Sequence, residues 1–118
     1  MGRNILLDKS FDFAVRIVNL NKYLVSDKKE FTLSKQVLRS GTAIGALTRE
    51  AQHAESNADF IHKLSIALKE ANETDYWLLL LHRTEYIEEN IYSSLNNNIQ
   101  ELLKLLVSII KSSKIKKQ

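Results

Sequence analysis

The absence of proline is the feature of this sequence that most restricts its fold. The 118 residues contain no proline and only three glycines, Gly2, Gly41 and Gly45, so few positions interrupt a helix. Apolar residues make up 44% of the chain, which is enough for a globular core, and the length fits one domain. We therefore predict an all-α fold of long helices in a single domain, residues 1–118.

The composition also restricts the compartment and the class of partner. The chain contains no cysteine, which excludes disulfides and thiolate metal sites and agrees with a reducing compartment. The N-terminus has no apolar run of signal-peptide length, and the most apolar stretch, residues 102–110, is about half as long as a membrane span. The formal net charge is +3, which allows an acidic partner. We expect a soluble, cytoplasmic protein without membrane contact.

Helical periodicity divides the chain into segments. Apolar residues recur three and four positions apart, between polar clusters, and predict four helices at about 10–25, 33–55, 58–86 and 89–112. Connections of about three to seven residues make neighbouring helices antiparallel, which gives an up-down-up-down four-helix bundle. Ser10 or Asp8 is expected to cap the first helix, and Ser56 with Asp59 the third. Residues 113–118 are charged and without core positions, so we expect a flexible basic tail.

Small residues line the second predicted helix around Gly41 and Gly45. Each glycine costs a helix about 1 kcal/mol relative to alanine, so a close contact is expected to compensate. That contact is either tight packing within one subunit or the approach of a second subunit or a ligand.

The opposite face of the second helix is basic. Lys35, Arg39 and Arg49 recur along it, and such a row is either ordinary solvated surface or a track for the phosphates of a nucleic acid. Arg39 has a second option, an ion pair with Glu70 or Glu73 of the third helix. The hypothesis of a nucleic-acid surface also includes the lysines at the C-terminus: Lys111, Lys114, Lys116 and Lys117.

The third helix is apolar on two sides near its C-terminal end. Besides its core stripe it carries a second apolar line, which a lone bundle does not need to bury. Either the fourth helix and a loop cover this line, or it meets another copy of the chain. The predicted oligomer interface consists of Ile66, Trp77, Leu80 and Leu81.

Few residues are suited to catalysis or metal binding. Two acid–histidine pairs at a spacing of three, Glu50 with His53 and Asp59 with His62, are half of what a di-iron bundle requires, and their histidines point away from the core stripe. The acidic residues of the third helix, Glu70, Glu73 and Asp75, do not share one face and have no nucleophile or base beside them. We therefore predict no enzyme activity, no metal and no cofactor.

Two segments of the sequence resemble a known family. They are Arg39-Ser40-Gly41-Thr42-Ala43-Ile44-Gly45-Ala46, followed by Glu50-Ala51, and the run from Asp59 through Lys69-Glu70-Ala71-Asn72-Glu73-Thr74-Asp75-Tyr76-Trp77-Leu78. They are similar to the four-helix-bundle family encoded in intervening sequences of bacterial 23S ribosomal RNA genes. The resemblance covers about residues 10–112. One departure is Leu47, where the family usually has asparagine, so a polar contact at this position is not carried over.

The resemblance implies an assembly and a class of partner. Members are similar to the accessory protein of diversity-generating retroelements, and both groups look like bundles that form homopentamers. That accessory protein binds nucleic acid and a reverse transcriptase through basic residues. The resemblance therefore favours a non-enzymatic oligomeric adaptor that binds structured RNA or DNA or a nucleic-acid enzyme. The alternative is a purely structural, self-associating bundle.

Overall fold

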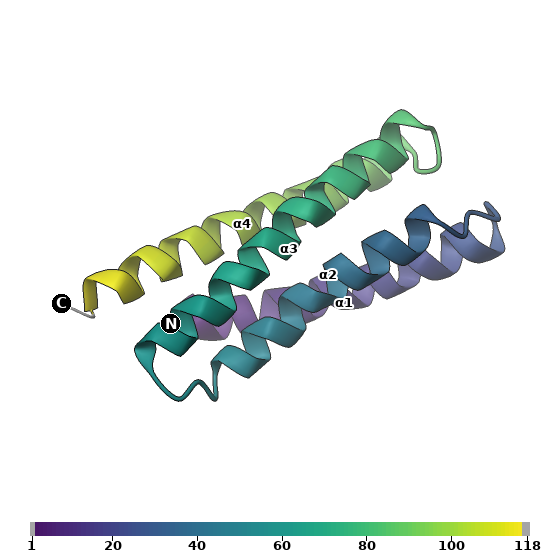
Figure 1. Cartoon of the computed structure of the whole chain (residues 1–118). Helices are drawn as coiled ribbons and strands as arrows, with labels where there is room; N and C mark the ends of the chain where they lie inside the picture. Colours follow the sequence, from purple (N-terminus) through teal and green to yellow (C-terminus); the bar gives the residue numbers. More distant parts are fainter. Residues whose placement is uncertain (1, 117–118) are drawn as a thin grey trace.

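The computed structural model describes residues 2–116 and, for side chains, residues 5–115. The described chain is all-helical, without a strand, and measures about 50 × 21 × 19 Å. Its four helices are α1 (Gly2–Ser26), α2 (Leu33–Ala51), α3 (Asn57–Arg83) and α4 (Glu89–Lys116). The helices run side by side along the long axis of the molecule (Figure 1). The predicted all-α, four-helix bundle is confirmed.

Each helix packs against two others. The contacts join α1 to α2, α2 to α3, α3 to α4 and α4 to α1. Within the described residues α1 does not pack against α3, nor α2 against α4, so these two pairs lie on the diagonals of the bundle. The α1–α4 seam is the least closely packed of the four. The outer surfaces of diagonal helices therefore face opposite sides of the molecule.

The helix bounds differ from the expected ones at both ends of the chain. α1 begins at Gly2 rather than near residue 10, because its first turns already bury Leu6 in the core. Ser10 and Asp8 therefore lie inside the helix and do not cap it. The Ser10 hydroxyl instead donates a hydrogen bond to the Leu7 carbonyl, at 3.2 Å.

α4 continues to Lys116 rather than ending near residue 112, so the expected flexible tail is wrong for residues 113–116. Ser113 is only 3% exposed, and its carbonyl accepts a hydrogen bond of 2.8 Å from the Asn57 amide at the start of α3. This contact fixes the end of α4 against the α2–α3 turn. Residues 117–118 of the expected tail lie outside the described residues.

The two middle helices end earlier than expected. α2 ends at Ala51 rather than at residue 55, and α3 at Arg83 rather than at residue 86. Glu85 follows with a φ of 67°, a left-handed conformation that ends a helix. The predicted cap of α3 is confirmed, because the Ser56 hydroxyl accepts a hydrogen bond of 3.0 Å from the Asp59 amide.

A buried carboxylate caps α2. Thr32 occupies the N-cap position but makes no capping bond with its own side chain. The Glu30 carboxylate instead accepts backbone hydrogen bonds from Thr32, Leu33 and Ser34, at 3.2, 2.9 and 2.7 Å. Burial by itself raises the pKa of Glu30, but the three backbone donors outweigh it and the pKa is lowered. The ionised carboxylate therefore stabilises the start of α2.

The two central glycines of α2 bring it close to α1. A Cβ atom on Gly41 would lie 2.8 Å from Cγ1 of Ile17, and one on Gly45 would lie 3.2 Å from the carbonyl oxygen of Ser10. Ile17 and Ser10 are completely buried. Of the two explanations for the glycines, tight packing within one subunit is the one that these distances support.

We predict that Gly41→Ala destabilises the bundle even though alanine is the better helix former. The new methyl group collides with a buried isoleucine that has no free space, and such overpacking exceeds the gain of about 1 kcal/mol in helix propensity. The free energy of unfolding should fall by about 1–2 kcal/mol. Urea unfolding followed by circular dichroism measures this, and an unchanged or higher stability would contradict the close α1–α2 packing.

We also predict that the contribution of Glu30 depends on pH. The folded-state pKa lies below the unfolded value, so the stabilisation is present above an unfolded pKa of about 4.3 and is lost as the pH falls through the folded value. Glu30→Gln should therefore cost about 1–2 kcal/mol at pH 7 and less at pH 3. Glu85→Gln, at an exposed position after the C-terminal end of α3, is the control. Equal costs at both pH values would rule out an ionised cap.

Candidate nucleic-acid interface

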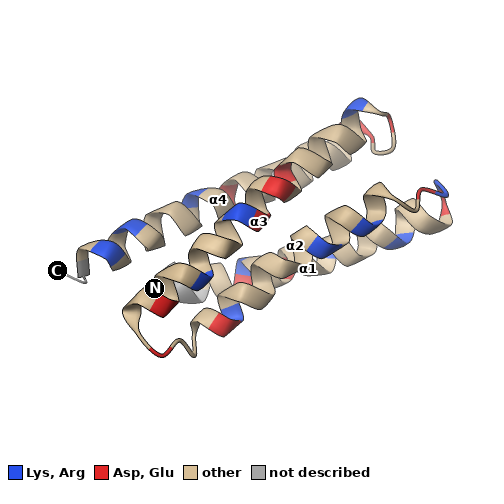
Figure 2. Cartoon of the chain, in the orientation of Figure 1, with Lys and Arg blue, Asp and Glu red and all other residues tan. Residues whose placement is uncertain are grey.

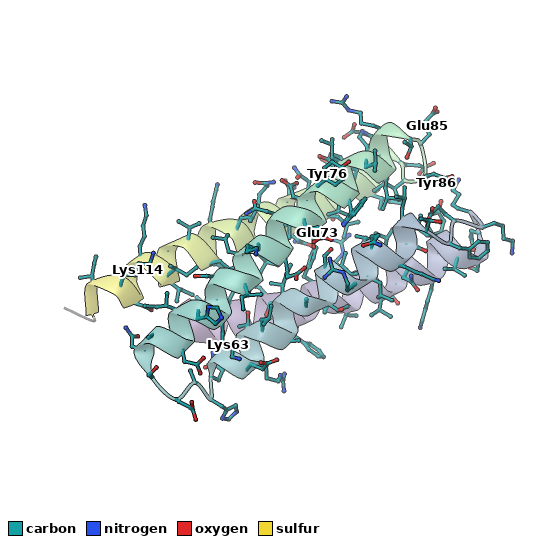
Figure 3. All side chains as sticks on the ribbon, in the orientation of Figure 1. Lys63, Glu73, Tyr76, Glu85, Tyr86 and Lys114 are labelled. Atoms are coloured by element: carbon teal, nitrogen blue, oxygen red, sulfur yellow. The ribbon has the colours of Figure 1, made fainter. Side chains whose placement is uncertain are left out.

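Arg39 lies between α2 and α3 rather than on a free basic face. One guanidinium nitrogen bonds to the Glu70 carboxylate at 3.1 Å, and the other bonds to Glu73. Figure 3 shows Glu73 on the side of α3 that faces α2. Of the two options for Arg39, the ion pair with the third helix is therefore the one that the structure shows. The same contacts give Glu70 and Glu73 a structural role.

A tryptophan completes this cluster. The Trp77 indole donates a hydrogen bond of 2.9 Å to the Glu73 carboxylate and packs edge-on against Tyr76, at 5.0 Å between ring centres. The hydrogen bond from Trp77 and then the one from Arg39 lower the pKa of Glu73. The hydrogen bond to Glu73 is also the main cause that raises the pKa of Arg39. The two carboxylates together more than offset the charge of Arg39, which leaves Arg39 a poor phosphate ligand.

The other two basic residues predicted on α2 are free of such pairs. Lys35 and Arg49 are exposed, and no salt bridge within the described part of the chain involves them. Fourteen residues of helix separate them, which is about 21 Å. Arg49 lies at the edge of a shallow hollow of about 230 Å³ between α1 and α2, whose lining includes Phe11, Thr42 and Ala46.

The C-terminal half of α4 carries a second and denser basic surface. Lys104, Lys111 and Lys114 are all exposed, and residues 102–118 contain no aspartate or glutamate. Figure 2 shows this half of α4 with basic segments and no acidic ones, and Lys114 points away from the bundle in Figure 3. We call Lys104, Lys111 and Lys114 the α4 lysines.

One of the α4 lysines was not among the residues predicted from the sequence. Lys104 lies seven positions before Lys111, which places both on one helix face. The seven-residue spacing of these two lysines, in a stretch without acidic residues, is the sequence signal that could have identified Lys104. Of the predicted tail lysines, Lys111 and Lys114 are exposed on α4, and their contact with nucleic acid stays a prediction. The side chain of Lys116 and all of Lys117 lie outside the described residues.

The two basic surfaces do not merge in one molecule. α2 and α4 are diagonal in the bundle, so Lys35 and Arg49 face one side while the α4 lysines face the other. In a single chain the two sets of the hypothesis therefore lie on separate surfaces. A nucleic acid that touches both sets needs to wrap around the bundle or to meet more than one copy.

The predicted oligomer interface on α3 needs one correction. Leu81 is completely buried in the bundle core, so it is not available to a second copy. Ile66, Trp77 and Leu80 are partly exposed and stay a prediction. Two more exposed apolar residues lie on the same helix, Tyr76 at 58% and Leu79 at 40%. The interface predicted from the sequence did not include these two residues.

The candidate metal and acid–base residues have other roles. Glu50 pairs with Lys63 at 3.4 Å, and the Asp59 carboxylate accepts a hydrogen bond from the Glu55 amide at 3.2 Å. His53 and His62 are exposed. Among the residues that the structure describes, no three histidine, aspartate or glutamate side chains cluster around a possible metal position. Over the same residues, no helix is both long and apolar enough to cross a membrane.

We predict that Arg39 contributes to stability and that its neighbour Lys35 does not. Arg39→Ala removes both ion pairs with α3, and because the side chain is 52% exposed the loss should be only about 0.5–1 kcal/mol. Lys35 is also exposed and lies four residues earlier on the same helix, but it makes no such pair. The Lys35→Ala variant should therefore be as stable as the wild type. Chemical unfolding of both variants tests this, and equal stabilities would contradict the ion-pair assignment.

Comparison with known proteins agrees with this fold. Residues 3–108 match the family model described as 23S rRNA-intervening sequence protein. A crystal structure of a protein with unknown function from the S23 ribosomal protein family of Bacteroides thetaiotaomicron VPI-5482 is 65% identical, with a TM-score of 0.93, covering 94% of this chain and 99% of that one. A search of curated proteins found no significant match. The chain belongs to the family of 23S rRNA-intervening sequence proteins.

Proposed function

We propose that this protein is a non-enzymatic, self-associating adaptor that binds structured RNA through its α4 lysines. The observation that carries the proposal is the acid-free surface of α4, where Lys104, Lys111 and Lys114 are exposed and have no salt bridge among the described residues. Lysines clustered along one helix form the kind of basic stripe that attracts the phosphates of a nucleic acid. Lys35 and Arg49 on the opposite side form a smaller, second contact.

Self-association gives this weak surface useful affinity. One subunit offers few phosphate contacts, so its own affinity should lie in the non-specific range of about 10⁻⁴ to 10⁻⁶ M. Linked copies raise the avidity by about 10² to 10⁴ without a new type of contact, provided that the RNA reaches several subunits. The exposed apolar residues of α1 and α3 support such an assembly. The expectation of a homopentamer, or of a reverse-transcriptase partner, comes from the family resemblance alone.

One observation favours a structural alternative. Lys114 lies in the last turn of α4, where a cation interacts favourably with the helix dipole. Glu88 and Glu89 lie beside its N-terminus, where acids do the same. In that alternative the protein is a self-associating bundle without a nucleic-acid partner, and the lysines stabilise α4 and keep the surface soluble.

Salt-dependent RNA binding distinguishes the two functions. We predict that the double variant Lys104→Ala, Lys111→Ala binds a structured RNA hairpin more weakly than the wild type at low salt. The slope of log affinity against log salt should also become shallower, by about 0.7 to 0.9 for each phosphate contact that is lost. Electrophoretic mobility-shift titrations at two or more salt concentrations measure both quantities.

The matched control is Lys28→Ala, Lys29→Ala. It removes the same charge from the α1–α2 connection, at the end of the bundle away from the C-terminal half of α4, and should bind like the wild type. If both double variants lose the same affinity, binding responds only to net charge. If neither loses affinity, or if the wild type does not bind at low salt, the structural alternative replaces the adaptor proposal.

A further inference from the structure

The hollow beside Arg49 places an exposed aromatic ring next to a free cation. It lies along the seam where α1 and α2 run side by side (Figure 1) and has a volume of about 230 Å³. Phe11 lines it from α1 and is 56% exposed, so much of its ring is open to solvent. We call this site the α1–α2 hollow.

The size of the α1–α2 hollow limits its ligand to one flat group. Sites that enclose a whole drug-sized molecule measure about 300–1,000 Å³, and this hollow is smaller. Three of the residues that line it, Ala14, Gly45 and Ala46, carry at most a methyl group. A planar ring can therefore lie close to the two helices and against Phe11, while the rest of its molecule stays outside.

Two polar side chains define the chemistry of that ligand. The Thr42 hydroxyl lines the hollow and already donates a hydrogen bond of 2.7 Å to the Leu38 carbonyl. It can therefore offer a ligand only its lone pairs, which accept from an N–H group. Arg49 supplies a positive charge at the edge. A flat ring with N–H donors that is attached to an anionic group has the chemistry of a nucleotide.

The acids near the α1–α2 hollow do not cancel the charge of Arg49. Arg49 is the one charged side chain among the described residues that line the hollow. The adjacent Glu50 pairs with Lys63 of α3, at 3.4 Å. Asp8 follows Leu7, which lines the hollow, and lies about 100° around α1 from it. An anion beside Arg49 therefore meets a net attraction.

We propose that the α1–α2 hollow receives one unpaired base of the bound RNA, which stacks on Phe11 while a neighbouring phosphate contacts Arg49. This rests on the RNA binding of the proposed function and specifies the kind of RNA. Proteins hold single-stranded bases by stacking them on aromatic rings. The bases of a continuous duplex are already stacked and paired, so the preferred RNA is a hairpin with an unpaired nucleotide.

The hollow and the α4 lysines lie at the same end of the bundle. Lys9 of α1 and Glu101 of α4 form an ion pair of 3.1 Å, which fixes the level of one helix against the other. Phe11 lies two residues from Lys9, and Lys104 lies three residues from Glu101. The bundle is only 21 × 19 Å across, so one RNA hairpin that wraps around this end can contact both sites.

Two RNA hairpins that differ at one bulged nucleotide test the proposal in mobility-shift titrations. One bulge carries its base, and the other is abasic with the same phosphates. The wild type should bind the base-containing hairpin about fivefold or more tightly, because of stacking. Phe11→Ala should remove this difference and leave the affinity for the abasic hairpin unchanged, whereas Phe11→Trp keeps an aromatic face and should keep the difference.

Two further variants separate stacking from charge. Phe31→Ala is the matched control, because Phe31 is 54% exposed but lies in the α1–α2 connection, outside the hollow; its preference for the base should equal that of the wild type. Arg49→Ala should weaken binding of both hairpins and reduce the slope of log affinity against log salt by about 0.7, the value for one contact to a single strand.

Equal binding of the two hairpins by the wild type would overturn the proposal and leave the hollow to another group, such as an aromatic side chain of a protein. A preference that survives Phe11→Ala, or that Phe31→Ala also abolishes, would overturn it too. If free adenosine monophosphate competes as well as the bulged hairpin, the hollow is a site for free nucleotides instead. Binding that needs Lys104 and Lys111 but ignores the base rejects only this proposal, whereas no binding at low salt rejects the adaptor function as well.

Discussion

The close approach of α1 and α2 at the two glycines determines how the rest of the bundle is arranged. Gly41 leaves room for the Ile17 side chain, and Gly45 leaves room for the α1 backbone. α1 therefore packs more closely against α2 than against α4. The looser α1–α4 seam is joined by polar contacts instead. Arg16 donates hydrogen bonds of 3.0 and 2.6 Å to Ser94 and Asn98, across the two helices. The α1–α2 side is fixed by shape at the two glycines, while the α1–α4 seam is held by hydrogen bonds between side chains.

The cluster between α2 and α3 decides which basic residues stay free. Arg39 bonds to the carboxylates of Glu70 and Glu73, and Trp77 donates a hydrogen bond to Glu73. A helix in a bundle has one buried side and one free side. The free side of α4 carries the α4 lysines together with two exposed apolar residues, Val107 and Ile115.

The sequence predicted the parts of this structure that depend on periodicity, and missed those that depend on which neighbour covers a side chain. The number of helices, their directions and the Ser56 cap follow from spacing alone. The burial of Leu81 did not follow from spacing. An apolar residue on a helix with two apolar sides turns inward or outward according to where the neighbouring helices lie. The sequence around the C-terminal lysines was expected to be a flexible tail. The hydrogen bond to the carbonyl of buried Ser113 instead holds this segment in α4. For Arg39 the sequence left two options, and only its distance to α3 decides between them.

Lysine footprinting by mass spectrometry tests the central claim most directly, since one experiment reports which lysines a bound RNA covers. The assembled protein is acetylated briefly with and without a structured RNA hairpin. The account predicts that RNA slows the reaction of the α4 lysines and Lys35, while Lys28 stays reactive. The account is contradicted if Lys104 and Lys111 react as fast with RNA as without it.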